Sequence, residues 1–141
     1  MGYSSRFEHE DIEITDLEGL KAFLKHWDET FQCGYSGTML TEFEGKYDFT
    51  FESWDDYKIV SYWCSDTIYF LKGISKFIKG YVCFIGEDNN MKAEIYLENN
   101  TFRVEEGEMN YHTYPADYYL EPRKDDVENQ KYRDFLAPYM I

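Results

Sequence analysis

The clearest periodicity in the chain lies between residues 17 and 31, where apolar side chains recur every three or four positions. This spacing predicts an amphipathic helix that buries one face. Thr15 and Glu18 stand where the two members of a capping box belong, so the helix is expected to begin directly after Thr15. The apolar positions of this helix are Leu17, Leu20, Phe23, Leu24, Trp27 and Phe31.

Extended segments lie on both sides of this helix. Residues 3–14 are predicted to form a strand, and three further extended stretches follow at residues 38–43, 46–52 and 57–63. The middle stretch alternates aromatic and polar residues, which is typical of a half-buried strand. Residues 53–56 predict the turn that pairs the third stretch back as a hairpin.

A second helical stripe begins after residue 64. Ser65 or Asp66 can cap its first turn. Gly80 is expected to end this helix as its C-terminal cap residue. The apolar positions that predict the helix are Ile68, Leu71, Ile74, Phe77 and Ile78.

Short strands dominate the rest of the core. They are predicted at residues 81–85, 92–97 and 101–105, and asparagine-rich turns separate them. Regular short strands with such turns are typical of an antiparallel meander.

The C-terminal part has a different character. Four tyrosines lie between two prolines with no period, and residues 123–136 predict a short third helix anchored by Val127, Phe135 and Leu136. We expect residues 109–141 to be a C-terminal extension, a Tyr-rich segment followed by a short helix that packs on the core.

The order of these elements predicts an α+β domain over residues 1–108, in which an antiparallel β-sheet carries two helices on one face. It embeds the β-α-β-β-α-β string of a ferredoxin-like core, with an extra hairpin. The 141-residue chain is long enough for one domain with a substantial core.

The net charge of the chain limits which classes of partner it is expected to bind. The chain has 28 acidic and 14 basic residues, a formal net charge of −14. Such a field repels nucleic acid and anionic membranes and attracts basic partners. Direct nucleic-acid binding, which needs a basic stripe, is therefore not expected. The alternative interpretation is that the acidity only keeps a surface rich in tyrosine soluble.

Cysteine usage indicates a reducing compartment. Cys33, Cys64 and Cys83 are odd in number and show no CxxC spacing, so neither a disulfide framework nor a zinc site is indicated. The sequence also lacks the pattern of a signal peptide and a long apolar run. We therefore expect a cytoplasmic protein that is not bound to a membrane.

Catalytic and cofactor motifs are not evident in the sequence. His9, His26 and His112 belong to no zinc-binding pattern. Cys64 precedes the second predicted helix, where a helix N-terminus would lower a thiol pKa, but the sequence places no base beside it. The glycines match no phosphate-binding loop. We predict neither an enzyme nor a cofactor.

Two patches of the chain resemble small uncharacterised proteins of bacteria and their phages. The first is Met1-Gly2-Tyr3-Ser4, with Phe7 and Ile14-Thr15 after it. The second runs from Gly80-Tyr81-Val82 through Gly86-Glu87-Asp88 to Asn99-Asn100 and Val104. In those relatives a helix likewise runs into a strand that ends in Gly-Glu, followed by a terminal hairpin. The resemblance implies this fold and a bacterial or phage origin, and it implies no activity.

Surface composition supplies the remaining functional signal. Carboxylates gather in residues 8–18, 42–56 and 87–108, and on adjacent strands and turns they could form one face that imitates nucleic-acid phosphates. Tyrosines add rigid contact area of the kind enriched at interfaces. The predicted partner-binding residues are Glu42, Glu44, Asp48, Glu52, Asp55, Asp56, Tyr111, Tyr114, Tyr118 and Tyr119.

Two functional hypotheses follow from these patterns. The first is a non-enzymatic acidic protein-binding domain, a phage-encoded inhibitor that mimics nucleic acid on the basic surface of a nuclease or defence complex. The alternative is a protein that binds or sequesters a small molecule or signalling nucleotide. It would use Trp54, Trp63 or the tyrosines of the C-terminal segment for stacking. Lys72 and Lys76, which cluster with Lys79 at helical spacing, would be the counter-ions. The oligomeric state is left open.

Overall fold

A computed structural model of the 141-residue chain describes residues 5–52, 65–86, 91–106, 110–121 and 126–140. The strands are β1 (Ser5–Ile14), β2 (Leu40–Phe43), β3 (Lys46–Phe49), β4 (Ile78–Gly86), β5 (Met91–Tyr96), β6 (Thr101–Glu106) and β7 (Asn110–Pro115). The α-helices are α1 (Leu17–Phe31), α2 (Tyr35–Thr38), α3 (Ser65–Ile74), α4 (Ala116–Leu120) and α5 (Gln130–Leu136). Single 3-10 turns, Val127–Asn129 and Ala137–Tyr139, flank α5.

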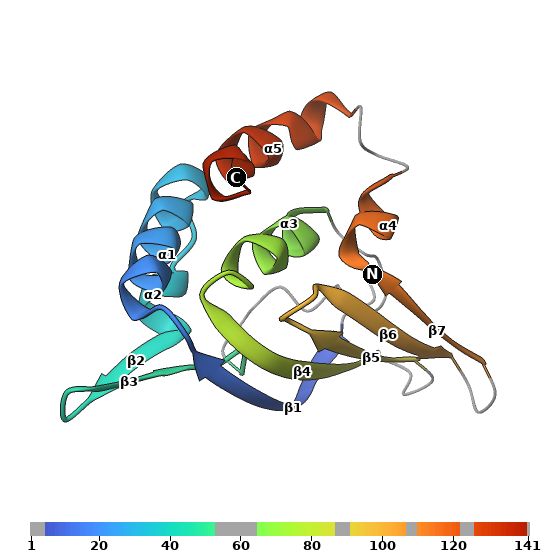
Figure 1. Ribbon diagram of the computed structural model, residues 1–141, viewed down its shortest axis with the longest axis horizontal. Helices are drawn as coiled ribbons and strands as arrows, with labels where there is room; N and C mark the ends of the chain where they lie inside the picture. The colour runs from blue at the N-terminus through green and yellow to red at the C-terminus, as the bar shows by residue number, and fades with distance from the viewer. Residues whose placement is uncertain (1–4, 53–64, 87–90, 107–109, 122–125, 141) are drawn as a thin grey trace.

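The main sheet has five antiparallel strands in the order β1-β4-β5-β6-β7, and β2 and β3 form a separate two-stranded sheet. Figure 1 shows α1, α3, α4 and α5 on one side of the main sheet. The predicted α+β class, with helices on one face of an antiparallel sheet, is therefore confirmed. The inner face of the sheet is fully apolar and buried at Val82, Phe84, Ala93, Ile95, Phe102 and Val104.

The ferredoxin-like arrangement is not confirmed. That arrangement requires the two strands that follow the first helix to join the main sheet, whereas β2 and β3 pair only with each other among the described residues. The reason lies in β2, where Leu40 is half-buried and Thr41, Glu42 and Phe43 are all exposed. A strand with no buried face has nothing to pack against the helices. The predicted strand at residues 57–63 lies outside the described residues.

An aromatic cluster joins the helices into one layer. Phe23 of α1 is fully buried, and its ring centroid lies 6.1 Å from Phe70 of α3 and 5.6 Å from Phe135 of α5. Tyr139, just beyond α5, lies 5.1 Å from Phe23 in an edge-to-face arrangement. Such aromatic pairs add about 0.5–1.5 kcal/mol each beyond the area they bury. The cluster thus holds the C-terminal helix to the rest of the core.

Two predicted helix ends are wrong. Asp16, not Thr15, caps α1, because its Oδ1 accepts the Gly19 amide at 2.9 Å. Helix α3 ends at Ile74, and Ile78 already begins β4. Gly80 therefore does not cap a helix. It lies within β4 at a φ of 114°, where a Cβ would overlap the Asp11 carbonyl of the neighbouring β1.

The C-terminal part contains a strand that the sequence did not reveal. Residues predicted as irregular form β7, which pairs with β6 from Thr101↔Pro115 to Glu106↔Asn110 and is the fifth strand of the main sheet. Phe135 and Leu136 are buried, as predicted for anchors of the last helix. Val127, the third predicted anchor, is 88% exposed and is not one.

The packing of α3 against α1 and α5 can be tested at Gly73. A Cβ at this position would lie less than 3.0 Å from the Phe23 ring and from Leu136. We expect Gly73→Ala to lower the free energy of unfolding by about 1–3 kcal/mol through overpacking, reduced by up to about 1 kcal/mol of gained helix propensity. Chemical denaturation measures the change. Gly37→Ala is the control, because Gly37 lies in helix α2 with no atom within 4 Å of an added Cβ; equal stability of the two variants would contradict this packing.

Candidate functional site

A two-stranded hairpin projects from one end of the molecule. We call residues 40–49, which comprise β2, β3 and their turn, the hairpin arm. At its tip Glu44 and Gly45 both have positive φ, at 51° and 80°, between the paired residues Phe43 and Lys46. Two such residues make the type I′ turn that matches the right-handed twist of a hairpin. The arm therefore has a defined conformation of its own.

The tip of the arm exposes an aromatic ring among carboxylates. Phe43 is 75% exposed, the largest value among the exposed aromatic residues described. Directly opposite residues share a face of an antiparallel pair, so Phe43 shares its face with Lys46, Thr41 and Asp48. Glu42 lies on the other face, where the Tyr47 hydroxyl donates to its Oε2 at 3.2 Å.

The base of the arm is fixed to the body. Phe49 and the following Phe51 are buried. The Phe51 amide donates to Glu10 Oε2 of β1 at 2.9 Å, and Lys21 of α1 lies 4.1 Å from the centroid of the Tyr47 ring. The arm is thus held by a buried base and two polar contacts, while its tip stays free of the body.

Burial raises the pKa of Glu10. Desolvation is the main cause, and the nearby carboxylates of Asp48 and Glu52 raise it further. Hydrogen bonds from the Phe51 amide and the Thr50 side chain act in the opposite direction. Three carboxylates therefore lie close enough to influence one another where the arm meets β1.

The structure divides the predicted partner-binding residues between two ends of the molecule. Glu42, Glu44, Asp48 and Glu52 are exposed on or just after the arm. Tyr114 of β7 and Tyr118 of α4 are stacked with centroids 4.0 Å apart, and Figure 1 shows α4 on the other side of the molecule from β2 and β3. Tyr111 and Tyr119 lie in β7 and α4, but their side chains are outside the description, as are Asp55 and Asp56. The structure therefore does not bring the described carboxylates and tyrosines together.

Carboxylates on the uncovered face of the main sheet are largely neutralised. Figure 1 shows no helix over this face. Each of three carboxylates there lies beside a cation on the same or a neighbouring strand, at 3.0 Å for Glu13–Lys79 and 3.5 Å for Glu94–Lys92. The third pair is Glu105 with Arg103. Three of the carboxylates on this face are therefore paired with cations.

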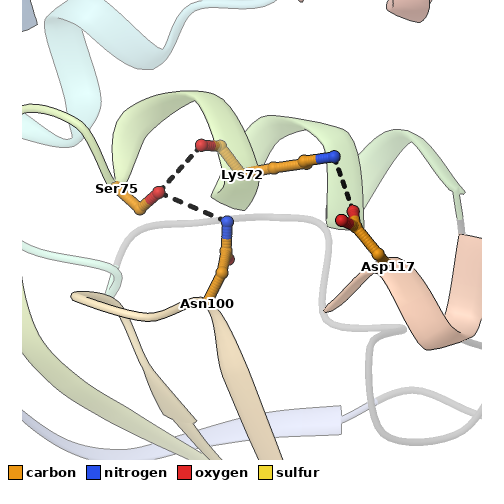
Figure 2. A network of polar contacts seen from close by, with 4 residues as sticks. All are labelled: Lys72, Ser75, Asn100 and Asp117. Atoms are coloured by element: carbon orange, nitrogen blue, oxygen red, sulfur yellow. Dashed lines mark hydrogen bonds and ion pairs between the residues drawn. The ribbon is translucent and has the colours of Figure 1, made fainter. Parts of the chain in front are cut away.

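Polar contacts connect α3, the β5–β6 turn and α4 (Figure 2). Ser75 Oγ donates to the Lys72 carbonyl at 2.8 Å and accepts from Asn100 Nδ2 at 3.3 Å. The Asn100 carbonyl accepts the Ala116 amide at 2.7 Å, at the start of α4. Lys72 Nζ then pairs with Asp117 Oδ1 at 2.5 Å. These contacts fix where α4 lies relative to α3.

A surface cavity of about 260 Å³ lies where α3, α4 and α5 meet. Its lining consists of Tyr69, Lys72, Asp117, Leu120, Glu121 and Arg133. Of the lysines predicted to cluster, only Lys72 reaches it. Lys76 is exposed beyond the end of α3, and Lys79 pairs with Glu13 in the sheet. The predicted lysine cluster is therefore wrong, because α3 ends at Ile74.

The described cysteines show no reactive setting. Cys83 is fully buried on β4, and burial raises the pKa of its thiol to about 11. A thiol with a raised pKa is a poor nucleophile near neutral pH. Cys33 is half-buried, and its Sγ donates to the Phe31 carbonyl at 3.8 Å. Cys64, Trp54 and Trp63 lie outside the described residues.

Comparisons with protein-family models, with curated proteins and with solved structures find no match to this chain. Within the described ranges, no helix has the length and apolar character needed to cross a membrane. The same part of the chain holds no group of three or more His, Cys, Asp or Glu side chains placed to hold a metal.

Glu10 gives a test of how the arm is attached. Because its pKa is raised in the fold, the folded state binds this proton more tightly than the unfolded chain. The stabilisation of the fold by protonated Glu10 is fully present below the ordinary glutamate pKa of about 4.3. It is lost as the pH rises through the pKa of Glu10 in the folded state. Glu10→Gln keeps an acceptor for Phe51 and cannot ionise.

We expect the stability of the wild type to fall relative to Glu10→Gln as the pH rises from about 4 to 7. Urea denaturation across this range measures the difference. Glu8→Gln, which removes a charge from an exposed side chain on the same strand, should show no such divergence. Parallel curves for the wild type and Glu10→Gln would contradict the assigned burial.

Proposed function

We propose that this protein is a non-enzymatic protein-binding domain that docks its hairpin arm on a basic protein surface. The observation that carries the proposal is the exposed Phe43 ring at the tip of an ordered, acidic hairpin. Leaving a phenylalanine in water forgoes about 1.5–3 kcal/mol that burial in a partner would recover. Aromatic side chains that fill a partner's pocket are typical centres of binding energy.

The arm's charge selects the partner. Glu42, Glu44 and Asp48 are exposed around Phe43, and Lys46 is the single basic residue of the arm. The total charge of −14 adds a long-range field of the same sign. Complementary charge raises the association rate and disfavours acidic partners. A basic surface with an apolar pocket therefore fits the arm best.

The shape of the arm supports binding without refolding. A type I′ turn, a buried base and the contacts to Glu10 and Lys21 fix the arm before it meets a partner. Preorganisation of this kind lowers the entropic cost of association. The stacked Tyr114 and Tyr118 would contact the same partner only if it extended along the whole molecule.

A basic surface that normally binds nucleic acid satisfies these requirements, since it already attracts phosphates and stacks bases. We therefore propose that the chain acts as a nucleic-acid mimic, a phage-encoded inhibitor of a nuclease or defence complex. Its negative arm would occupy the nucleic-acid-binding groove of the partner in place of the nucleic-acid backbone. Phe43 would take the place of a stacked base.

Affinity capture from host lysate at low salt, followed by mass spectrometry, tests the proposal when four proteins are compared side by side. They are the wild type, Phe43→Ala, the arm triple variant E42Q/E44Q/D48N, and the control E29Q/E98Q/E128Q, whose three exposed acids lie outside the arm. We expect a basic protein to be retained by the wild type and the control. Phe43→Ala and the arm variant should each lose about tenfold or more in retention.

Both triple variants have the same net charge, so the comparison separates the arm from the overall field. Capture of the basic protein should also weaken as salt rises, because exposed charges are screened over about 10 Å at 0.1 M ionic strength. Equal loss in the two triple variants, or full retention by Phe43→Ala, would overturn the proposal.

A further inference from the structure

Arg133 of α5 forms no ion pair with a carboxylate of the described residues. Its Nη2 donates to the Asp126 carbonyl at 2.8 Å and to Gln130 Oε1 at 3.0 Å. Its Nη1 is buried and has no hydrogen-bond partner in the described part of the chain. Both acceptors are neutral groups. Although the chain has 28 acidic residues, none of those that the structure describes pairs with this guanidinium.

The surroundings of Arg133 hold it in this state. Gln130 Nε2 donates to Asp134 Oδ1 at 2.7 Å, which turns the amide oxygen of Gln130 toward the guanidinium. The Asp134 carboxylate therefore binds the Gln130 amide, and Gln130 lies between it and Arg133. A buried donor without an acceptor costs about 1–3 kcal/mol, and more when the group is charged. A turn of the guanidinium toward an acceptor supplied from outside the chain would remove that cost.

Arg133 lines the cavity between α3, α4 and α5, and Lys72 is the second cation of its wall. The Lys72 side chain is 27% exposed, whereas its partner Asp117 is 68% exposed. Figure 2 shows Lys72 extending along α3 to meet Asp117. Because an ammonium group has three donors, the pairing with Asp117 leaves Lys72 able to bind a second oxygen.

Two further lining residues give the cavity an apolar side. Tyr69 and Leu120 line the cavity and are 5% and 6% exposed. The Tyr69 ring is stacked on Tyr132, with centroids 5.6 Å apart and planes inclined by 15°. A fixed aromatic wall suits a flat or apolar ligand body. The cavity volume lies near the lower end of the range for small-molecule sites, about 300 Å³.

We propose that this cavity binds a small organic oxyanion, a phosphate or carboxylate carried on a flat body. In the bound state the Arg133 guanidinium, which lines the cavity, turns so that the oxyanion accepts from its Nη1 and from Lys72 Nζ, and the body lies against Tyr69 and Leu120. Asp117 and Glu121 border the same cavity. Their charges, with the net charge of the chain, select against polyanions. The site is independent of the hairpin arm, which lies at the other end of the molecule (Figure 1).

Isothermal titration with phenyl phosphate and with benzoate tests the site and distinguishes the two oxyanions. Phenol is the uncharged counterpart, and tripolyphosphate is the polyanion. We expect the wild type to bind one or both aromatic oxyanions at least about tenfold more tightly than phenol or tripolyphosphate. Failure to bind either aromatic oxyanion up to about 10 mM, a Kd too weak for a selective site, would overturn the proposal.

Substitutions then locate the site. Arg133→Gln should weaken the bound oxyanion by about tenfold or more, because a charge-assisted hydrogen bond is lost. Lys131→Gln, an equal charge change on an exposed side chain of the same helix, should leave the affinity within about twofold. If circular dichroism shows that Arg133→Gln does not fold, Arg133→Lys, which keeps the charge, replaces it in the affinity comparison. Equal weakening by Arg133→Gln and Lys131→Gln would show that only the overall charge matters and would contradict the site.

Discussion

The buried ring of Phe23 is the contact on which the rest of the structure depends. It lies between α1, α3 and the C-terminal helix α5, within 6.1 Å of the ring centroids of Phe70, Phe135 and Tyr139. Gly73 allows α3 to approach this ring because it has no side chain. His26 Nδ1 lies 3.0 Å from the Tyr139 hydroxyl and adds a polar contact between α1 and the end of the chain. The aromatic cluster holds α5 in place, and Arg133 of α5 forms part of the wall of the cavity between α3, α4 and α5. The cavity therefore depends on this cluster.

These helices pack on one face of the sheet, and the other face carries charged side chains. The uncovered strands place Lys79, Lys92 and Arg103 beside carboxylates, so much of the negative charge there is balanced. The hairpin arm has no strand neighbour to supply such cations in the described structure. The arm therefore keeps three exposed carboxylates and one lysine around an exposed aromatic ring.

Local patterns in the sequence predicted the parts of the fold that depend on local contacts. Helix α1 follows from its apolar spacing, and the antiparallel strands follow from short apolar runs between turns. Gly80 was misinterpreted because a glycine after an apolar stripe also fits a helix end, and only the neighbouring strand shows why a side chain is excluded. Strand β7 was missed because its residues have no hydrophobic alternation, and pairing with β6 holds it in place.

The candidate sites were predicted to different degrees. The carboxylates of the arm were found because acidic residues gather in the sequence, and Lys72 was singled out as a counter-ion. Phe43 was missed, because a strand pattern does not tell which aromatic side is left exposed. Arg133 was not predicted, since the lack of a carboxylate beside it among the described residues is a property of tertiary structure. The one available cue was a basic residue within the short helix that carries Phe135 and Leu136.

Hydrogen–deuterium exchange measured by mass spectrometry tests most directly whether the Phe23 cluster unites the helices. If it does, the amides of α1, α3 and α5 should exchange slowly and at similar rates, and more slowly than those of the hairpin arm. Exchange of α5 at the rate of the arm, while α1 and α3 stay protected, would contradict the account.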